Sequence, residues 1–157
     1  MLELKRPFYG VDMNQIDYYQ AKLDFEIDSA ELFNALAVDD GNIVVVDTRS
    51  ALAYDIEHIH GAINLPHRSL SGEVIRQLDS NMLYVCYCDG VGSNVSTKGA
   101  FALATGDVEV VVLMGGLEGW KRDGYPTEGR RERSGPRSSV AVDRYRDDDI
   151  RDVNSRC

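Results

Sequence analysis

The sequence predicts a parallel α/β fold in which helices cover both faces of a central sheet. Three runs rich in β-branched residues have the continuous apolarity typical of strands buried on both faces: 41–49, 82–87 and 108–116. Segments with apolar residues at helical spacing separate these runs. Because strand and helix alternate along the chain, we expect a three-layer α/β/α arrangement with a mostly parallel sheet.

The other expected elements follow in chain order. They are a loose lead-in (1–10), a helix (about 12–23), a short extended piece (25–27), a helix from Asp28 to Leu36, short helices at 50–57, 68–78 and 117–126, a small strand (62–65) and a packed helix (94–105). The helix at 12–23 carries Ile16, Tyr19 and Leu23 on one apolar face. Asp28 and Glu31 have the spacing of a capping box, which predicts a helix start at this point.

Composition limits the classes of function. The 157 residues, 43% of them hydrophobic, suit one domain with room for a tail. A formal net charge of −9 argues against a nucleic-acid partner, because such a partner requires basic patches. No stretch is long and apolar enough to span a bilayer and the N-terminus has no signal-peptide core, so we expect a cytoplasmic protein without a membrane partner.

The domain boundaries follow from changes in composition. Residues 1–24 form the helical lead-in and 25–128 the α/β domain. Residues 129–157 are dense in Arg, Asp and Ser, which predicts a charged and mostly disordered tail or, as the alternative, a short docking helix near its end.

Cys88 lies at the end of the strand at 82–87, where α/β folds bind their ligands. The turn that follows, CDGVGSN (88–94), is rich in glycine, so several backbone N–H groups can point inward beside a helix N-terminus. Such a cup stabilises negative charge and favours a nucleophilic thiolate. The alternative is a buried structural thiol, which is our interpretation of Cys86.

Two other cysteine chemistries fit the spacing poorly. Three cysteines are no disulfide framework, and one residue between Cys86 and Cys88 departs from the two-residue spacing of redox and zinc motifs. Neither His60 nor His67 has metal-ligand spacing with the cysteines, so we expect no metal. A phosphatase or arsenate reductase remains an alternative, but Asn94 stands where a phosphatase loop places its arginine.

Residues 25–128 resemble single-domain rhodanese-like proteins of the thiosulfate sulfurtransferase superfamily. VVVDTRSALAY and EHIHGAINLP resemble the family's D-x-R and GHI-x-GA-x-x-IP motifs, and MGGLEGWKRDGYP resembles its GG-x-x-x-W signature. YCDGVGSNVSTK and PHR are similar to a long-loop subgroup with the pattern YC-x-G-x-x-CN-x-x-TK. Ser93 replaces the second cysteine of that pattern, and Glu57 replaces the glycine before the HI pair.

The resemblance implies a sulfurtransferase that uses no cofactor, in which Cys88 accepts a sulfane sulfur as a persulfide. It assigns the cradle for the anion to the loop residues Asp89, Gly90, Val91, Gly92, Ser93 and Asn94. It implies structural roles for Asp47 and Arg49 as a buried charge pair, for His58 in hydrogen bonding and for Trp120 in the core. Arg68 and Lys98 are the nearest cationic candidates for attracting thiosulfate.

Asp89 bears on the choice of substrate. The resemblance implies a small sulfur-containing anion, thiosulfate, as the donor. A carboxylate directly after the nucleophile is expected to repel thiosulfate and to weaken activity with it, which favours a small organic persulfide or a protein persulfide as the donor. A protein could equally be the sulfur acceptor. The alternative from another functional class is a non-catalytic rhodanese-like module that uses the same loop and the tail to bind a partner.

Overall fold

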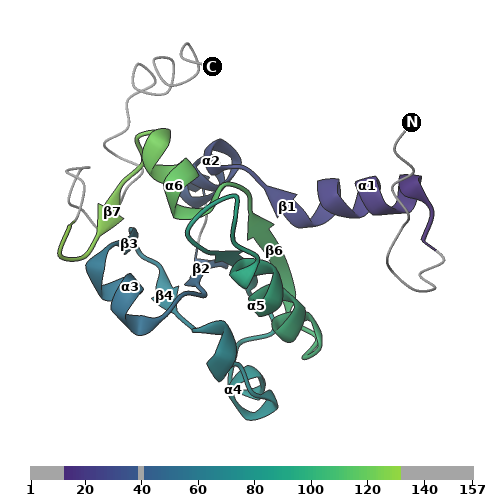
Figure 1. The fold of residues 1–157 in the computed structure, drawn as a ribbon. Helices are drawn as coiled ribbons and strands as arrows, with labels where there is room; N and C mark the ends of the chain where they lie inside the picture. The colour runs from purple at the N-terminus through teal and green to yellow at the C-terminus, as the bar shows by residue number, and fades with distance from the viewer. Residues whose placement is uncertain (1–12, 39–40, 132–157) are drawn as a thin grey trace.

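The computed structural model describes residues 13–38 and 41–131. The helices and strands follow the expected alternation (Figure 1). Their bounds are α1 Gln15–Phe25, β1 Glu26–Ile27, α2 Ser29–Val38, β2 Ile43–Asp47, α3 Ala51–Ile56, β3 His58–Ile59, β4 Ile63–Asn64, the 3-10 helix η1 His67–Ser69, α4 Gly72–Arg76, β5 Leu83–Tyr87, α5 Val95–Ala104, β6 Glu109–Leu113, α6 Gly116–Arg122 and β7 Thr127–Glu128. The tail beyond residue 131 and the first part of the lead-in lie outside the described residues.

Five strands form the central sheet in the order β1-β6-β5-β2-β4, and every pair in it is parallel. All five strands therefore end at the same edge of the sheet. β3 and β7 form a separate antiparallel pair, in which His58 lies opposite Glu128. Neither strand was expected from the sequence, because their pairing joins segments about 70 residues apart and neither segment has a strand pattern of its own.

Apolar side chains of alternate strand residues fill two cores, one on each face of the sheet. Val45 and Val85 belong to the core that α2 and α6 cover, together with Trp120. Val46 and Cys86 belong to the opposite core, which α4 and α5 cover. The predicted three-layer arrangement is confirmed, and its cause is that residues i and i+1 of a strand point to opposite faces.

Side-chain caps decide where several helices begin. The predicted capping box is present, since the Glu31 N–H donates to Asp28 Oδ1 (2.8 Å) and the Asp28 N–H donates to Glu31 Oε2 (2.8 Å). The helix predicted at 68–78 is wrong in its extent. The chain leaves helical geometry after η1, and Ser71 then caps α4 by accepting the Val74 N–H (3.3 Å).

The first helix also differs from its expected bounds. Asn14 Oδ1 accepts the Asp17 N–H (2.9 Å), so α1 begins later than predicted and extends to Phe25. The expected apolar face does not pack inside the domain, because no residue of α1 is buried. Within the described ranges, no helix is long and apolar enough to cross a membrane.

Candidate active site

Cys88 follows the last residue of β5, at the edge where the parallel strands end. Thr48 fixes this strand end to β2. Both its N–H (3.1 Å) and its hydroxyl (2.8 Å) donate to the carbonyl oxygen of Tyr87. The backbone before the thiol is therefore held by buried hydrogen bonds on the neighbouring strand, as a well-positioned nucleophile requires.

The Cys88 side chain points into the turn and is only 3% exposed. Its Sγ lies 3.1 Å from Ser96 Oγ and 3.4 Å from the carbonyl oxygen of Ser93. When the sulfur is a thiolate, the Ser96 hydroxyl can donate to it; when it is a thiol, Sγ–H can donate to Ser93. The hydroxyl of Ser96 is thus placed to stabilise the charged form of the nucleophile.

Sequence analysis did not single out Ser96. The signal was present, because Ser96, Gly99 and Leu103 have the spacing of one helix face and are the three buried residues of α5. A small polar residue at the first inward-facing position of a helix that follows a cysteine loop is close to that cysteine.

The turn from 88 to 94 keeps backbone donors available. The Ser93 N–H donates to the Gly90 carbonyl (3.1 Å) and closes the turn. Among the described residues, no acceptor is found for the N–H groups of 89–92 and Asn94. Val91 at the tip is 90% exposed. These N–H groups can therefore bind an anion or water.

Two backbone hydrogen bonds from α6 hold the start of the cysteine loop. The N–H groups of Leu117 and Glu118 donate to the carbonyl oxygens of Cys88 (2.9 Å) and Asp89 (2.8 Å). Gly116 has φ +55°, and a Cβ at this position would collide with the Cys88 carbonyl group. The glycine pair after β6 is thus required by a close approach of two backbones.

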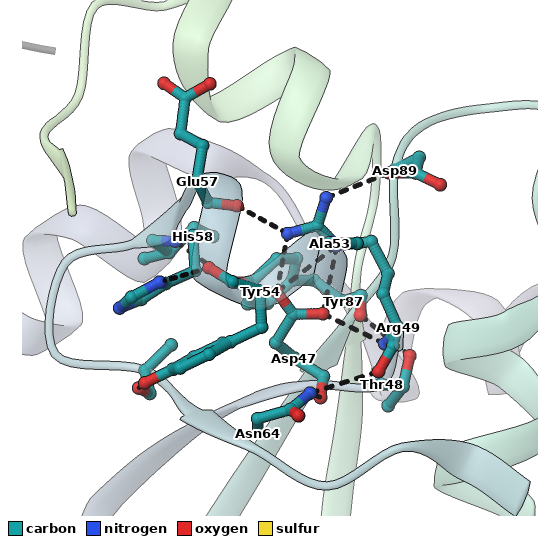
Figure 2. Close-up of polar contacts among 12 residues, drawn as sticks. Asp47, Thr48, Arg49, Ala53, Tyr54, Glu57, His58, Asn64, Tyr87 and Asp89 are labelled. Carbon is teal, nitrogen blue, oxygen red and sulfur yellow. Dashed lines mark hydrogen bonds and ion pairs between the residues drawn. The ribbon is translucent and has the colours of Figure 1, made fainter. Parts of the chain in front are cut away.

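A buried ion pair lies beneath the loop (Figure 2). Asp47 is 0% exposed, and its Oδ2 accepts from Arg49 Nη2 (2.7 Å) and from the Tyr87 hydroxyl (2.8 Å). Its Oδ1 accepts from the N–H (2.9 Å) and Nε (3.0 Å) of Arg49. Asn64 Nδ2 donates to the carbonyl oxygens of Asp47 and Arg49, both at 3.0 Å. The ends of β2, β4 and β5 are therefore joined through this pair.

The cluster shifts the pKa values of two of its members. Burial lowers the pKa of Arg49, but the hydrogen bonds and charge of Asp47 outweigh it, so the net shift is upward. The pKa of Tyr87 is raised, first by burial and then by the adjacent Asp47 carboxylate. The guanidinium stays charged and the phenol stays neutral, which matches the donors that Asp47 requires.

Arg49 also reaches the residue after the nucleophile. Its Nη1 donates to Asp89 Oδ1 (3.0 Å), and its Nη2 donates to the Glu57 carbonyl oxygen (2.6 Å), as Figure 2 shows. The Asp89 side chain is 66% exposed, so this is the outermost contact of Arg49. The ion pair offsets part of the negative charge that the sequence places beside Cys88.

Glu57, which replaces the glycine of the family motif, has its negative charge paired with a lysine. The residue is buried, its Oε2 forms an ion pair with Lys121, and its Oε1 accepts the Thr127 hydroxyl (2.9 Å). The carboxylate thereby ties the end of α3 to α6 and β7. Sequence analysis could not identify these partners, since they lie more than 60 residues away along the chain.

The histidines of the motif contact β7. His58 Nδ1 lies 2.8 Å from the Tyr54 carbonyl oxygen, and its Nε2 lies 3.2 Å from Glu128 Oε2. His60 Nδ1 lies 2.6 Å from the other oxygen of Glu128. Neither imidazole contacts Cys88. In the part of the chain that the structure describes, no three His, Cys, Asp or Glu side chains form a metal-binding group.

The remaining predicted residues lie at the periphery of the site or in the core. Arg68 on η1 and Lys98 on α5 are exposed, and these two elements pack together. Trp120 is 1% exposed, and its Nε1–H donates to the Pro126 carbonyl (2.8 Å). The structure therefore brings Cys88, its loop, Arg49 and Asp47 together, and leaves His58 and Trp120 away from the sulfur.

Cys86, two residues before the nucleophile, is fully buried, and burial raises its pKa to about 12. The unfolded chain loses this proton near pH 8.5, so the thiol's contribution to stability is complete below that pH and is lost as the pH rises toward 12. We expect the free energy of unfolding to fall from pH 8 to 10, with about 2 kcal/mol of the fall due to Cys86. Urea titrations at both pH values should show a smaller fall in Cys86→Val; an equal fall in both proteins would contradict this assignment.

The model of the rhodanese-like domain matches residues 29–123, which includes both the Asp47–Arg49 pair and the cysteine loop. The chain belongs to the rhodanese-like family. It is also similar to proteins named thiosulfate sulfurtransferase GlpE. The protein from Pseudomonas fluorescens is 35% identical over 96 residues, which cover 60% of this chain and 84% of the relative. The protein of the same name from Pseudomonas entomophila is 38% identical over 96 residues, which also cover 60% of this chain and 84% of the relative.

Solved structures agree with the rhodanese-like fold. The BH2092 protein from Bacillus halodurans is 32% identical with a TM-score of 0.69, and the match covers 74% of this chain and 85% of that one. A protein from Lactobacillus plantarum is 30% identical with a TM-score of 0.64, covering 72% and 95%. The expectation of a rhodanese-like domain is thereby confirmed.

Proposed function

We propose that this rhodanese-like protein moves a sulfane sulfur from thiosulfate or a persulfide donor to a thiophilic acceptor through a Cys88 persulfide. The Cys88 thiolate attacks the outer sulfur of thiosulfate, the S–S bond of the donor breaks, and sulfite leaves with the bonding electron pair. An acceptor such as cyanide or a thiolate then takes the terminal sulfur and restores the thiolate. The two steps balance without a cofactor or an external oxidant.

The position of Cys88 Sγ carries this proposal. The sulfur lies inside a turn with available N–H groups and 3.1 Å from the Ser96 hydroxyl, which are the donors that an anionic persulfide needs. Asp47 and Arg49 act beneath the loop and hold its base, as the family resemblance implies. Arg68 and Lys98 would attract an anionic donor from the surface without touching the sulfur.

Intact mass after incubation with thiosulfate, without reductant, tests the proposal. We expect the wild type and Cys157→Ser, which lacks the third cysteine at the last position of the sequence, to gain one sulfur atom that cyanide removes, while Cys88→Ser gains none. A parallel incubation with an organic persulfide covers the case in which Asp89 repels thiosulfate. If neither donor adds sulfur to the wild type, the sulfurtransferase proposal fails.

Ser96 supplies a second, graded prediction. Replacement of Ser96 by Ala removes the hydroxyl at 3.1 Å from Sγ and should lower kcat/KM by about 100-fold, the lower end of the effect of losing one donor to a developing anion. Ser96→Thr keeps a hydroxyl and should retain more activity than Ser96→Ala. Steady-state thiocyanate formation measures both, and equal rates in the wild type and Ser96→Ala would remove Ser96 from the site.

A binding module without catalysis is the second candidate, and the nearly complete burial of Cys88 beneath an exposed loop tip favours it. In that case Val91, rather than the thiol, would meet the partner. A biological function that survives Cys88→Ser but not Val91→Asp would support the binding module.

A further inference from the structure

α1 has apolar side chains on two opposite faces. Ile16, Tyr19 and Leu23 share one face, because successive helical residues are about 100° apart, and they are 79%, 61% and 77% exposed. Tyr18, Ala21 and Phe25 share the opposite face. A helix that is apolar on both sides requires a partner on each of them.

The domain itself provides little cover for α1. The main contacts of the helix are with β1 and β6, and in Figure 1 it extends away from the sheet. An 11-residue helix is marginal in water without tertiary packing. The outer face is defined by Ile16, Tyr19 and Leu23, and the inner face by Tyr18, Ala21 and Phe25. Both faces therefore need a surface that residues 13–38 and 41–131 of one chain do not supply.

A large apolar hollow lies between the inner face of α1 and the body of the domain. Its volume is about 820 Å³, and Phe101 of α5 and Val110 and Val111 of β6 line its far wall. Phe101 is 74% exposed. β1 pairs with β6 only at Val112 and Leu113, so the hollow opens along an unpaired part of the β6 edge.

We propose that two copies of this chain form a dimer by exchanging α1, each helix entering the hollow of the other copy. The layers would then follow the order domain, partner helix, own helix, partner domain. The inner faces of the two helices meet on a twofold axis, and the outer face of each helix packs on Phe101 and the β6 edge of the other copy. This arrangement is closed and isologous.

A second copy fits better than other occupants for two reasons. The helix and the hollow that it fills lie on the same chain, so one symmetric contact covers both apolar faces and both hollows. A membrane is a poor alternative, because the only basic residue of α1, Lys22, pairs with Glu26 at 2.8 Å and leaves no basic face for anionic lipid.

The exposed apolar area is also large enough for a dimer interface. Six side chains that are about half or more exposed contribute: Ile16, Tyr18, Tyr19, Leu23, Phe25 and Phe101. Aromatic side chains bury about 150–250 Å² each, so the set supplies roughly 800 Å², the size of one side of a standard interface.

Light scattering after size exclusion, at a series of concentrations of the full chain, tests the dimer. We expect twice the mass of the single chain, and we expect Leu23→Asp and Phe101→Asp to raise Kd by roughly a hundredfold, since each places a carboxylate in an apolar contact. Val38→Asp is the matched control, because Val38 is 86% exposed on α2 and lies outside the hollow. A monomeric wild type at every concentration would overturn the proposal and leave residues 1–12 of the same chain as the cover.

Cross-linking distinguishes exchange from other dimers. In a Cys88→Ser, Cys157→Ser background, a mixture of Leu23→Cys and Phe101→Cys chains should give a cross-linked heterodimer with a short bis-maleimide. Leu23→Cys alone should give little product, because the outer faces do not meet each other. Strong Leu23–Leu23 cross-linking, or a dimer without the mixed product, would refute the exchange of α1.

Discussion

Asp47→Asn is expected to lower the free energy of unfolding by about 3–5 kcal/mol, the cost of leaving a buried charge without its partner. The substitution preserves the shape of the side chain but removes the charge that faces Arg49, whose own side chain is 8% exposed. It also forces an amide N–H₂ against donors of Arg49 or Tyr87. Urea unfolding followed by circular dichroism at a fixed protein concentration measures the change.

An exposed ion pair provides the control for Asp47→Asn. Arg122 contacts Asp123 at 3.2 Å with a side chain 76% exposed, so Arg122→Gln should cost less than about 1 kcal/mol. Adding Arg49→Met to Asp47→Asn should recover part of the loss, because it removes the unpaired charge. A loss below about 1 kcal/mol in Asp47→Asn would mean that the buried pair does not brace the strand ends.

Gly116→Ala should have the largest effect on activity outside Cys88 itself. The new methyl group would collide with the carbonyl group of Cys88 and would occupy a backbone with φ +55°. Because the N–H groups of α6 hold the Cys88 and Asp89 carbonyls, the loop must shift as well. A displacement of about 1 Å at a nucleophile costs roughly 100-fold, so we expect kcat/KM for thiosulfate to fall by at least that factor.

Gly92→Ala separates this collision from a general intolerance of the loop. Nothing lies within 4 Å of a Cβ built on Gly92, so its sulfur-transfer rate and its stability should remain close to wild type. Thermal unfolding of both variants shows whether Gly116→Ala loses activity while it is still folded. Wild-type kcat/KM in Gly116→Ala would show that the α6 contact does not position the thiol.

The strands and the cysteine turn could be predicted from the sequence because their signals are local. Continuous β-branched runs identify strands buried on both faces, and Cys88 follows directly after one of them. Helix starts were predictable where a cap supplies a nearby acceptor, as at Asp28, and were misplaced where a cap went unnoticed, as at Ser71. The resemblance of three motifs to those of rhodanese-like proteins indicated which fold these elements form together.

Contacts between distant segments were not predictable from local patterns. The compensation of Glu57 by Lys121 and Thr127 depends on how α6 and β7 return to α3. The apolar spacing of α1 indicated a helix, but it did not say whether the cover is the same domain or another molecule. Periodicity reports that a face is apolar and contains no information about what buries it.

The fluorescence of Trp120 reports on the packing of the domain core. It is the single tryptophan of the chain, it is 1% exposed, and its ring lies against Phe33 and Tyr125. Native emission should therefore be blue-shifted, and a red shift should accompany water reaching this core. Because α6 also holds the cysteine loop, the wavelength of that emission follows the integrity of the loop's support without any added label, and a lifetime measurement would reveal partial loosening that leaves the remaining secondary structure intact.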